Sequence, residues 1–281
     1  MGIIDSNQII EYLETGKDVV FIDARGGADA YERYKAGHLK NAYFVDLETD
    51  LSNKTDNAAN GGRHPLPEPG DFAKLLTELG ISLSSTVVVY DDKKGANAAA
   101  RFWWMLRAAG LEMAYVVSGG LESLVAAGFE LTDKEPLRLT NFQDFTLEEW
   151  KLPVAGIDRV TEVSQKEDFL VIDVRENYRY RGESEPIDLV AGHIPGAVNI
   201  PYTSNLDETG AFLSPEKLTE KYNAVLNGRK PENVIVHCGS GVTACHTLLA
   251  LEEAGITGAN LYVGSWSEWS RNELPIATEK D

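Results

Sequence analysis

A cysteine in this sequence follows a short apolar run directly and precedes a serine that has glycine on both sides. From Val234 to Cys245 the chain reads Val-Ile-Val-His-Cys-Gly-Ser-Gly-Val-Thr-Ala-Cys. In open α/β sheets ligands bind beyond the carboxyl ends of the strands, so Cys238 stands where a reactive group is expected. Its thiolate would face the backbone N–H groups of residues 239–243 and the positive end of a following helix, which stabilise an anion. We therefore predict that Cys238 is a nucleophile and that Gly239, Gly241, Val242 and Thr243 bind the anion.

Two other roles for this cysteine have less support. A buried structural cysteine is the common case in apolar strands, but it does not need the flexible Gly-Ser-Gly loop that follows here. A zinc site built from His237, Cys238, Cys245 and His246 would join a strand to a helix without the usual short Cys-x₂-Cys pairing. We expect no metal and no other cofactor, and we expect Cys245 to be a core or helix-face residue.

A cysteine phosphatase uses a similar loop between strand and helix. That class needs an arginine six residues after the cysteine to bind phosphate and stabilise the transition state. Here this position is Ala244. Phosphatase activity is therefore a minor alternative.

The elements that must position the cysteine are short β-branched runs that alternate with helical stretches. The strand-like runs are residues 19–23, 86–90, 113–117, 169–173, 233–237 and 260–263. Residues 96–109 and 243–254 have high helix propensity and broad apolar faces. This alternation predicts the α/β class, with mainly parallel sheets covered by helices.

The chain also repeats itself once. Four segments recur in the same order at a spacing of about 150 residues, which indicates a duplicated domain. The aligned position for Cys238 in the first copy is Asp91. The pairs Asp23 with Arg25 and Asp173 with Arg175 occur in both copies, so we expect them to be structural ion pairs.

Between and within the copies lie polar stretches. Residues 132–154 read as a linker, which predicts a first domain at 1–131 and a second at 155–281. Residues 46–70 are rich in Asn, Gly and Pro and predict a long loop of the kind that often carries function.

Composition and charge narrow the possible partners and compartments. The chain has 281 residues and a net charge of −18, which opposes binding to nucleic acid or anionic membrane. An anionic substrate would therefore need locally placed arginines. The first residues are acidic and no long apolar run is present, so we expect a cytoplasmic protein without a secretory signal or membrane span. Only two cysteines are present, which suits a reducing compartment.

The double domain, the Cys-Gly-Ser-Gly-Val-Thr-Ala loop, the Ala-Gly-His-Ile-Pro-Gly-Ala segment and the Gly-Ser-Trp-Ser-Glu-Trp stretch resemble the two-domain rhodanese family. The resemblance covers nearly the whole chain. It implies two tandem rhodanese-like domains, of which the first is inactive because Asp91 cannot carry sulfur. It also implies that Cys238 becomes a persulfide and passes sulfur to cyanide or to a thiol, such as that of a thioredoxin-like protein. A nonenzymatic interaction module of this family would normally lack the cysteine.

The loop sequence also bears on the sulfur donor. Gly239-Ser240 resembles the 3-mercaptopyruvate type, whereas the thiosulfate type usually has a basic pair after its cysteine. The resemblance further implies a proton relay in which Ser240 acts with His64 and Asp46.

The resemblance implies that Arg179 binds the carboxylate of the sulfur donor. Arg181 lies nearby in the sequence and is a second candidate for donor binding. A planar guanidinium can hold a carboxylate through two hydrogen bonds. Mercaptopyruvate enzymes of the family usually have a second arginine after a Glu-Pro pair, but here Glu185-Pro is followed by Ile187 and Asp188. The sequence therefore favours a 3-mercaptopyruvate sulfurtransferase and leaves thiosulfate or another small anionic sulfane donor as the alternative.

Overall fold

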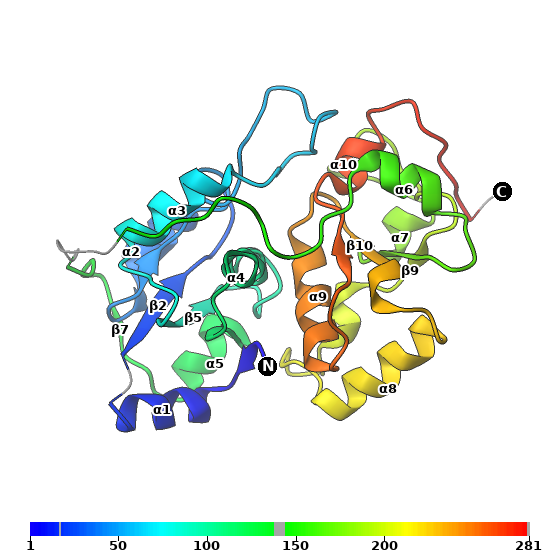
Figure 1. Ribbon diagram of the computed structural model, residues 1–281. Helices are drawn as coiled ribbons and strands as arrows, with labels where there is room; N and C mark the ends of the chain where they lie inside the picture. Colours follow the sequence, from blue (N-terminus) through cyan, green and yellow to red (C-terminus); the bar gives the residue numbers. More distant parts are fainter. Residues whose placement is uncertain (17, 138–143, 280–281) are drawn as a thin grey trace. The chain divides into compact units, whose positions relative to one another are not determined.

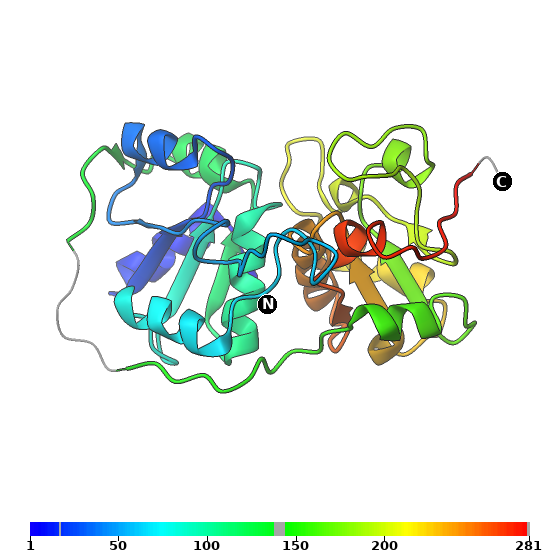
Figure 2. The same cartoon turned by 90° about the horizontal axis from the view of Figure 1, so that it is seen from above.

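A computed structural model describes residues 1–16, 18–137 and 144–279 (Figure 1). The chain forms two compact units. The first contains residues 1–53, 67–151 and 208–212, and the second contains residues 54–66, 152–207 and 213–281. Figures 1 and 2 show that each unit has a sheet with helices on its faces.

The first unit has a five-stranded sheet in the order β1-β6-β5-β2-β4. All four strand pairings are parallel, as predicted. The central strand β5 is buried along its whole length, which explains its unbroken Thr-Val-Val-Val-Tyr sequence. The strands of this sheet are β1 (Ile3–Ile4), β2 (Val19–Asp23), β4 (Tyr43–Phe44), β5 (Thr86–Tyr90) and β6 (Ala114–Val117).

Helices cover this sheet, and one of them is apolar nearly all the way around. In α4 every residue except Arg107 is buried, as expected for a helix without a polar face. A short antiparallel pair, β3 (His38–Leu39) with β7 (Leu131–Thr132), lies apart from the main sheet. The helices are α1 (Ser6–Glu14), α2 (Ala30–Ala36), α3 (Pro69–Glu78), α4 (Ala98–Ala109) and α5 (Gly120–Ala126).

The second unit repeats this plan with four parallel strands in the order β11-β10-β8-β9. Its central strand β10 is followed directly by the cysteine loop and then by α9, which lies beside the strand in Figure 1. The strands are β8 (Leu170–Asp173), β9 (Val198–Asn199), β10 (Val234–His237) and β11 (Asn260–Leu261). The helices are α6 (Ile157–Val163), α7 (Asn177–Tyr180), α8 (Pro215–Leu226), α9 (Thr243–Glu253) and α10 (Ser265–Trp269), with short 3₁₀ turns at Tyr202–Asn205 and Pro231–Asn233.

The repeated Asp-x-Arg pairs are structural, as predicted. Arg25 contacts Asp23 at 2.6 Å, and Arg175 contacts Asp173 at 2.5 Å, with all four side chains buried. Each arginine also donates to a distant carbonyl, Gly37 O at 3.0 Å and Gly192 O at 2.7 Å. The pair therefore fastens the strand end to the Ala-Gly-His segment in each copy.

Two segments pack with the unit that does not contain their chain neighbours. Residues 54–66, from the expected long loop, belong to the second unit, and residues 208–212 belong to the first. In the first unit Lys94 Nζ donates to Thr209 O at 3.3 Å, and Phe212 N donates to Ser118 Oγ at 3.0 Å. The long loop is held in part by α10 of the second unit, which accepts hydrogen bonds from the backbone N–H groups of Gly61 and Arg63.

Part of the expected linker, residues 138–143, lies outside the described residues. The stretch up to Lys151 packs as part of the first unit. Phe145 N donates to Thr77 Oγ1 at 2.9 Å, and Lys151 N donates to Ala108 O at 2.8 Å. The ranges 1–131, 132–154 and 155–281 remain a prediction about where the duplicated copies begin and end.

Candidate active site

Cys238 lies immediately after β10, at the carboxyl end of the sheet, and is only 2% exposed. Its backbone N–H donates to Ser265 Oγ at 3.1 Å. Its carbonyl accepts from Trp266 N at 3.0 Å. The start of α10 therefore holds the cysteine backbone in place.

The loop after Cys238, residues 239–242, requires glycine at one position. Gly241 has φ of +76°, and a Cβ there would lie 2.5 Å from Val263 O. Among the described residues, no protein atom accepts a hydrogen bond from the N–H groups of Gly239, Ser240 or Val242. The first N–H groups of α9 also lack partners within their helix. The loop therefore offers several donors next to the thiol.

The first copy shows what the corresponding loop does when an anionic side chain occupies it. Asp91, the counterpart of Cys238, is fully buried. Its carboxylate accepts from Lys93 N and Gly95 N, both at 2.8 Å, from Asn97 N at 3.0 Å and from Ala99 N at 3.3 Å. Lys94, the counterpart of Gly241, also has a positive φ, of 61°. Burial raises the pKa of Asp91 although these four N–H groups oppose the shift. The duplicated loop is thus a turn whose N–H groups converge on carboxylate oxygens.

Ser240 and His64 meet in the second unit. His64 Nδ1 lies 2.7 Å from Ser240 Oγ, within hydrogen-bond distance, and both residues are mostly buried. The resemblance predicted this pair, although the two residues are 176 positions apart in the chain.

The segment that carries His64 is attached to α10. Gly61 N donates to Glu268 Oε1 at 2.8 Å, and Arg63 N donates to Ser267 Oγ at 3.0 Å. Gly62 has φ of +81°, and a Cβ there would lie 2.4 Å from Gly264 O. Close backbone packing therefore fixes the position of the histidine.

Asp46 belongs to the first unit. Its Oδ1 accepts from Glu48 N at 2.6 Å and from Thr49 N at 3.1 Å, which closes a turn. Its place in the relay stays a prediction.

Arg179 is brought to the cysteine loop, but other carboxylates already hold it. Its Nη2 lies 2.8 Å from Glu185 Oε1, and its Nη1 lies 3.3 Å from Glu176 Oε2. A Cβ built on Gly239 would lie 3.4 Å from Arg179 Nη2. Although burial opposes it, contact with Arg179 lowers the pKa of Glu185, so this pair is ionised at neutral pH.

Arg181 is at the surface instead. Its side chain is 45% exposed, and its Nε contacts Glu279 at 2.8 Å. The structure gives it no contact with the cysteine loop among the described residues. Its predicted role in donor binding has no geometric support.

Three residues near the loop were missed by the sequence analysis. Asp188 has a fully buried carboxylate that contacts Arg63 Nε at 3.1 Å, Arg271 Nη1 at 3.0 Å and Arg179 Nη2 at 3.5 Å. For Asp188 one feature of the sequence indicated a role, namely that Ile187 and Asp188 stand where the family usually has an arginine. No sequence pattern around Arg63 or Arg271 indicated a role for either residue.

His237, the residue before the cysteine, is also fully buried. Its Nε2 lies 3.8 Å from Asp173 Oδ2. Burial lowers the pKa of His237 despite the attraction of Asp173, so the ring is neutral at pH 7. The contact is therefore not an ion pair under those conditions.

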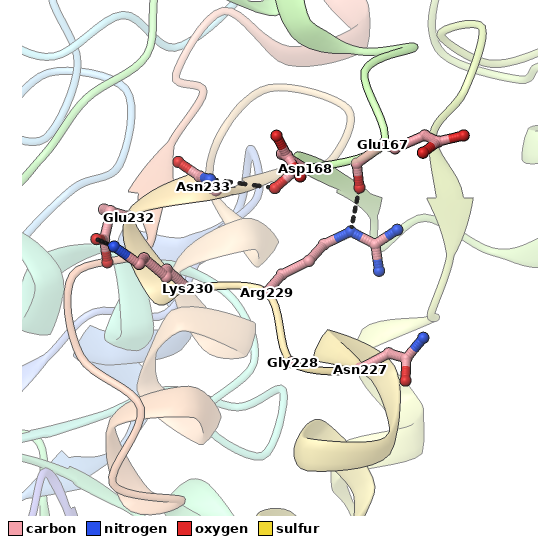
Figure 3. A pocket seen from close by; sticks show the side chains of 8 residues that line it. All are labelled: Glu167, Asp168, Asn227, Gly228, Arg229, Lys230, Glu232 and Asn233. Carbon is pink, nitrogen blue, oxygen red and sulfur yellow. Dashed lines mark hydrogen bonds and ion pairs between the residues drawn. The ribbon is translucent and has the colours of Figure 1, made fainter.

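A large surface hollow lies at the other end of the same sheet (Figure 3). Its lining includes Arg229, whose Nε donates to Glu167 O at 2.9 Å, and Asn233, whose Nδ2 donates to Asp168 O at 3.1 Å. These residues precede β8 and β10, whereas Cys238 follows β10. The hollow is therefore not the site of the cysteine chemistry.

In the part of the chain that the structure describes, neither a metal site nor a membrane-spanning helix is found. No group of three or more His, Cys, Asp or Glu side chains there is arranged to hold a metal ion. None of its helices has the length and apolar character needed to cross a membrane.

The sequence and structure match known proteins over most of the chain. The model of the Rhodanese-like domain matches residues 6–127 and 157–272. A Pseudomonas aeruginosa protein named "Probable 3-mercaptopyruvate sulfurtransferase" is 44% identical, over 87% of this chain and 86% of its own length. The thiosulfate sulfurtransferase of Rattus norvegicus is 31% identical, over 98% of this chain and 93% of its own length. The chain therefore belongs to the rhodanese family, as the sequence analysis predicted.

A solved structure agrees with this assignment. The crystal structure of SseA from Escherichia coli, reported for "the 'Rhodanese' fold and catalytic mechanism of 3-mercaptopyruvate sulfotransferases", is 30% identical with a TM-score of 0.76. The match covers 95% of this chain and 99% of SseA. The predicted fold class, two tandem rhodanese domains with mainly parallel sheets, is confirmed.

Proposed function

We propose that this protein is a sulfurtransferase that takes sulfur from 3-mercaptopyruvate onto Cys238 and passes it to a thiol or to cyanide. The observation that carries the proposal is the pair of duplicated loops. In one loop an aspartate accepts from four N–H groups. In the other a cysteine is followed by the N–H groups of Gly239, Ser240 and Val242, which have no acceptor among the described residues. Such a loop stabilises a thiolate and, after transfer, a persulfide anion.

The reaction has two half-reactions. In the first, the Cys238 thiolate attacks the sulfur of the donor, and the C–S bond of the donor breaks. The bonding electrons leave with carbon as the enolate of pyruvate, and Cys238 becomes a persulfide. In the second, an acceptor thiolate or cyanide attacks the outer sulfur and releases the Cys238 thiolate.

The enolate needs a proton to become pyruvate. Ser240 Oγ lies beside the thiol loop and within hydrogen-bond distance of His64 Nδ1, at 2.7 Å. We assign to this pair the transfer of that proton, with the hydroxyl as donor and the imidazole as its source. Asp46 is the predicted third member.

Thiosulfate is the second candidate donor. The relative from Rattus norvegicus is a thiosulfate sulfurtransferase, and Asp188 stands near the position where a second arginine was expected. Attack on thiosulfate expels sulfite and requires no proton. Proton transfer by Ser240 and His64 is therefore needed with 3-mercaptopyruvate but not with thiosulfate.

The setting we propose is the cytoplasm, with a thioredoxin-like dithiol as one acceptor. Both cysteines are free thiols, which suits a reducing compartment. In this scheme the first domain forms no persulfide of its own, because Asp91 replaces the cysteine.

Intact mass spectrometry tests the proposal directly. The reduced protein is exposed briefly to 3-mercaptopyruvate and, separately, to thiosulfate. We expect a gain of one sulfur atom with 3-mercaptopyruvate and pyruvate as the product. Cys238→Ser should gain none, whereas Cys245→Ser, the matched control, should behave like the native protein. A gain with thiosulfate alone would replace the donor assignment, and a gain in Cys238→Ser would overturn the mechanism.

A further inference from the structure

Three guanidinium groups surround the buried carboxylate of Asp188 beside the cysteine loop. Arg63 Nε and Arg271 Nη1 contact the same oxygen, Oδ1, at 3.1 and 3.0 Å. Arg179 Nη2 lies 3.5 Å from the other oxygen. A single carboxylate thus positions three arginines, all within the second unit.

The three arginines differ in what remains available for a ligand. Arg179 donates Nε to Glu185 and Nη1 to Glu176, and its side chain is 7% exposed. Its Nη2 lies 2.8 Å from Glu185 Oε1 but makes no hydrogen bond among the described residues, so one nitrogen remains. Arg271 uses Nη1 on Asp188 and on Ser267 O. In the described part of the chain, Arg63 uses only Nε on its side chain, so both of its terminal nitrogens are without a partner.

The guanidinium group of Arg63 lies next to the cysteine loop and is accessible to a ligand from solvent. A Cβ built on Gly239 would lie 3.2 Å from Arg63 Nη2, the shortest distance from that point to any described atom outside the residues next to Gly239. The Arg63 side chain is 28% exposed, compared with 7% for Arg179. Its terminal nitrogens thus border the loop that begins at Cys238 and can be reached from solvent.

The direct ion pairs compensate Arg63 less than Arg179. Arg179 contacts two carboxylates, those of Glu185 and Glu176. Arg63 and Arg271 share the single carboxylate of Asp188. A monoanionic carboxylate that accepts two parallel hydrogen bonds from Nη1 and Nη2 matches both the charge and the geometry of the Arg63 guanidinium.

We propose that Arg63 binds the carboxylate of the sulfur donor and that Asp188 positions Arg63 for this role. The inference rests on the proposed function and names the residue that supplies the second guanidinium in this chain. The arginine comes from the segment before His64 instead of the segment after the Glu-Pro pair. Donor binding and the proton relay would then depend on two adjacent residues.

The test compares two donors that differ only in the carboxylate. 3-Mercaptopyruvate has it, whereas 1-mercaptopropan-2-one keeps the thiol and the ketone without it. In the full-length protein, Arg63→Gln should raise KM for 3-mercaptopyruvate about 10- to 100-fold with a much smaller change in kcat, because a charged hydrogen-bonded contact is lost. The same variant should leave KM for the uncharged donor within about 2-fold. Arg63→Lys keeps the charge but not the planar fork and should fall between the native protein and Arg63→Gln.

Arg229→Gln is the control, since it removes a guanidinium group at the other end of the same sheet, where Arg229 Nε donates to Glu167 O. It should change KM for 3-mercaptopyruvate by less than about 3-fold. Thermal melts of each variant confirm folding. The inference is overturned if the native protein turns over 3-mercaptopyruvate while Arg63→Gln has an unchanged KM for it. It is also overturned if Arg63→Gln raises KM equally for the uncharged donor, or if Arg229→Gln raises KM for 3-mercaptopyruvate as much as Arg63→Gln does. If the native protein acquires no sulfur from 3-mercaptopyruvate, the proposed function fails as well, which the first mass measurement reveals separately.

Discussion

At the scale of single residues, the position of Cys238 depends on a serine in an uncommon conformation. Ser265 has φ of +52°, where a side chain is strained, and its Oγ accepts the Cys238 N–H while donating to Tyr262 O at 2.8 Å. The counterpart in the first copy is Gly120, with φ of 62° and no such strain. The serine is therefore present for its hydroxyl.

Two variants at this position separate the hydrogen bond from the strain. Ser265→Ala leaves the buried Cys238 N–H without an acceptor and keeps the strain, so it should lower the free energy of unfolding by ~1–3 kcal/mol. Ser265→Gly also loses the bond but relieves the strain, and it should be about 1 kcal/mol more stable than Ser265→Ala. Urea unfolding measures both. Equal stability of the two variants would contradict the role assigned to the strain.

Ser240 provides a second prediction at this scale. Ser240→Ala removes the proposed proton donor and should lower kcat with 3-mercaptopyruvate by about 10²-fold while KM changes little. Persulfide formation from thiosulfate should be much less affected, because sulfite leaves without a proton. Stopped-flow or quenched mass measurements with both donors make the comparison. A similar loss with both donors would indicate that Ser240 acts through the loop structure.

At the scale of elements, the Asp91 loop predicts a stability effect confined to the first unit. Asp91→Ala leaves the four N–H groups that its carboxylate accepts without that partner, and it should lower the free energy of unfolding of this unit by ~3 kcal/mol. Asp91→Asn retains one oxygen and should cost less. Thermal and urea unfolding measure the loss. The kcat of sulfur transfer per folded molecule should not change, and a large fall would mean that this loop also serves the reaction.

Strands and helices could be predicted well because their signals are local. The expected strand at 86–90 coincides with β5, and the expected helix at 243–254 differs from α9 by one residue at its end. The position of Cys238 at a strand end followed from the same patterns. The pattern of apolar residues shows where a buried strand ends and the next helix begins. This was enough to predict that Cys238 lies at the end of a strand.

Contacts between distant segments could not be predicted in this way. The pair of His64 and Ser240 was expected only from the family resemblance. The cluster of Arg63, Asp188 and Arg271 was not expected, because each of these residues looks locally like a solvated surface charge. Their partners are determined by how segments 54–66 and 183–190 pack on α10, which no short-range pattern encodes.

At the scale of the whole molecule, stability should fall in mildly acidic solution. Burial lowers the pKa of His237 below the value of about 6.5 that it has in the unfolded chain. Between these two pKa values the unfolded chain binds a proton that the folded protein does not, so stability is greatest above pH 6.5 and decreases as the pH falls. The slope from this one group is about 1.4 kcal/mol per pH unit.

Urea unfolding between pH 5 and pH 8 tests this prediction. Replacement of His237 by Asn should remove most of the pH dependence of stability between pH 5 and 6.5, whatever it does to stability at pH 8. An unchanged slope in the variant would assign the effect to other groups.

The carboxylates of Asp173 and Glu185 affect stability in a separate pH range. Their pKa values are lowered, so their stabilising contacts with arginine are lost only below about pH 4.5, as they become protonated.

The placement of residues 54–66 in the second unit also bears on how a duplicated gene of this kind can evolve. The first half of the gene encodes Asp91 in place of the cysteine, so it would be free to decay if the two halves were independent. Yet that half encodes Arg63 and His64, which lie beside the loop that follows Cys238. On the proposed function, deletion of the silent half would remove both residues, so natural selection on the active half preserves the inactive one.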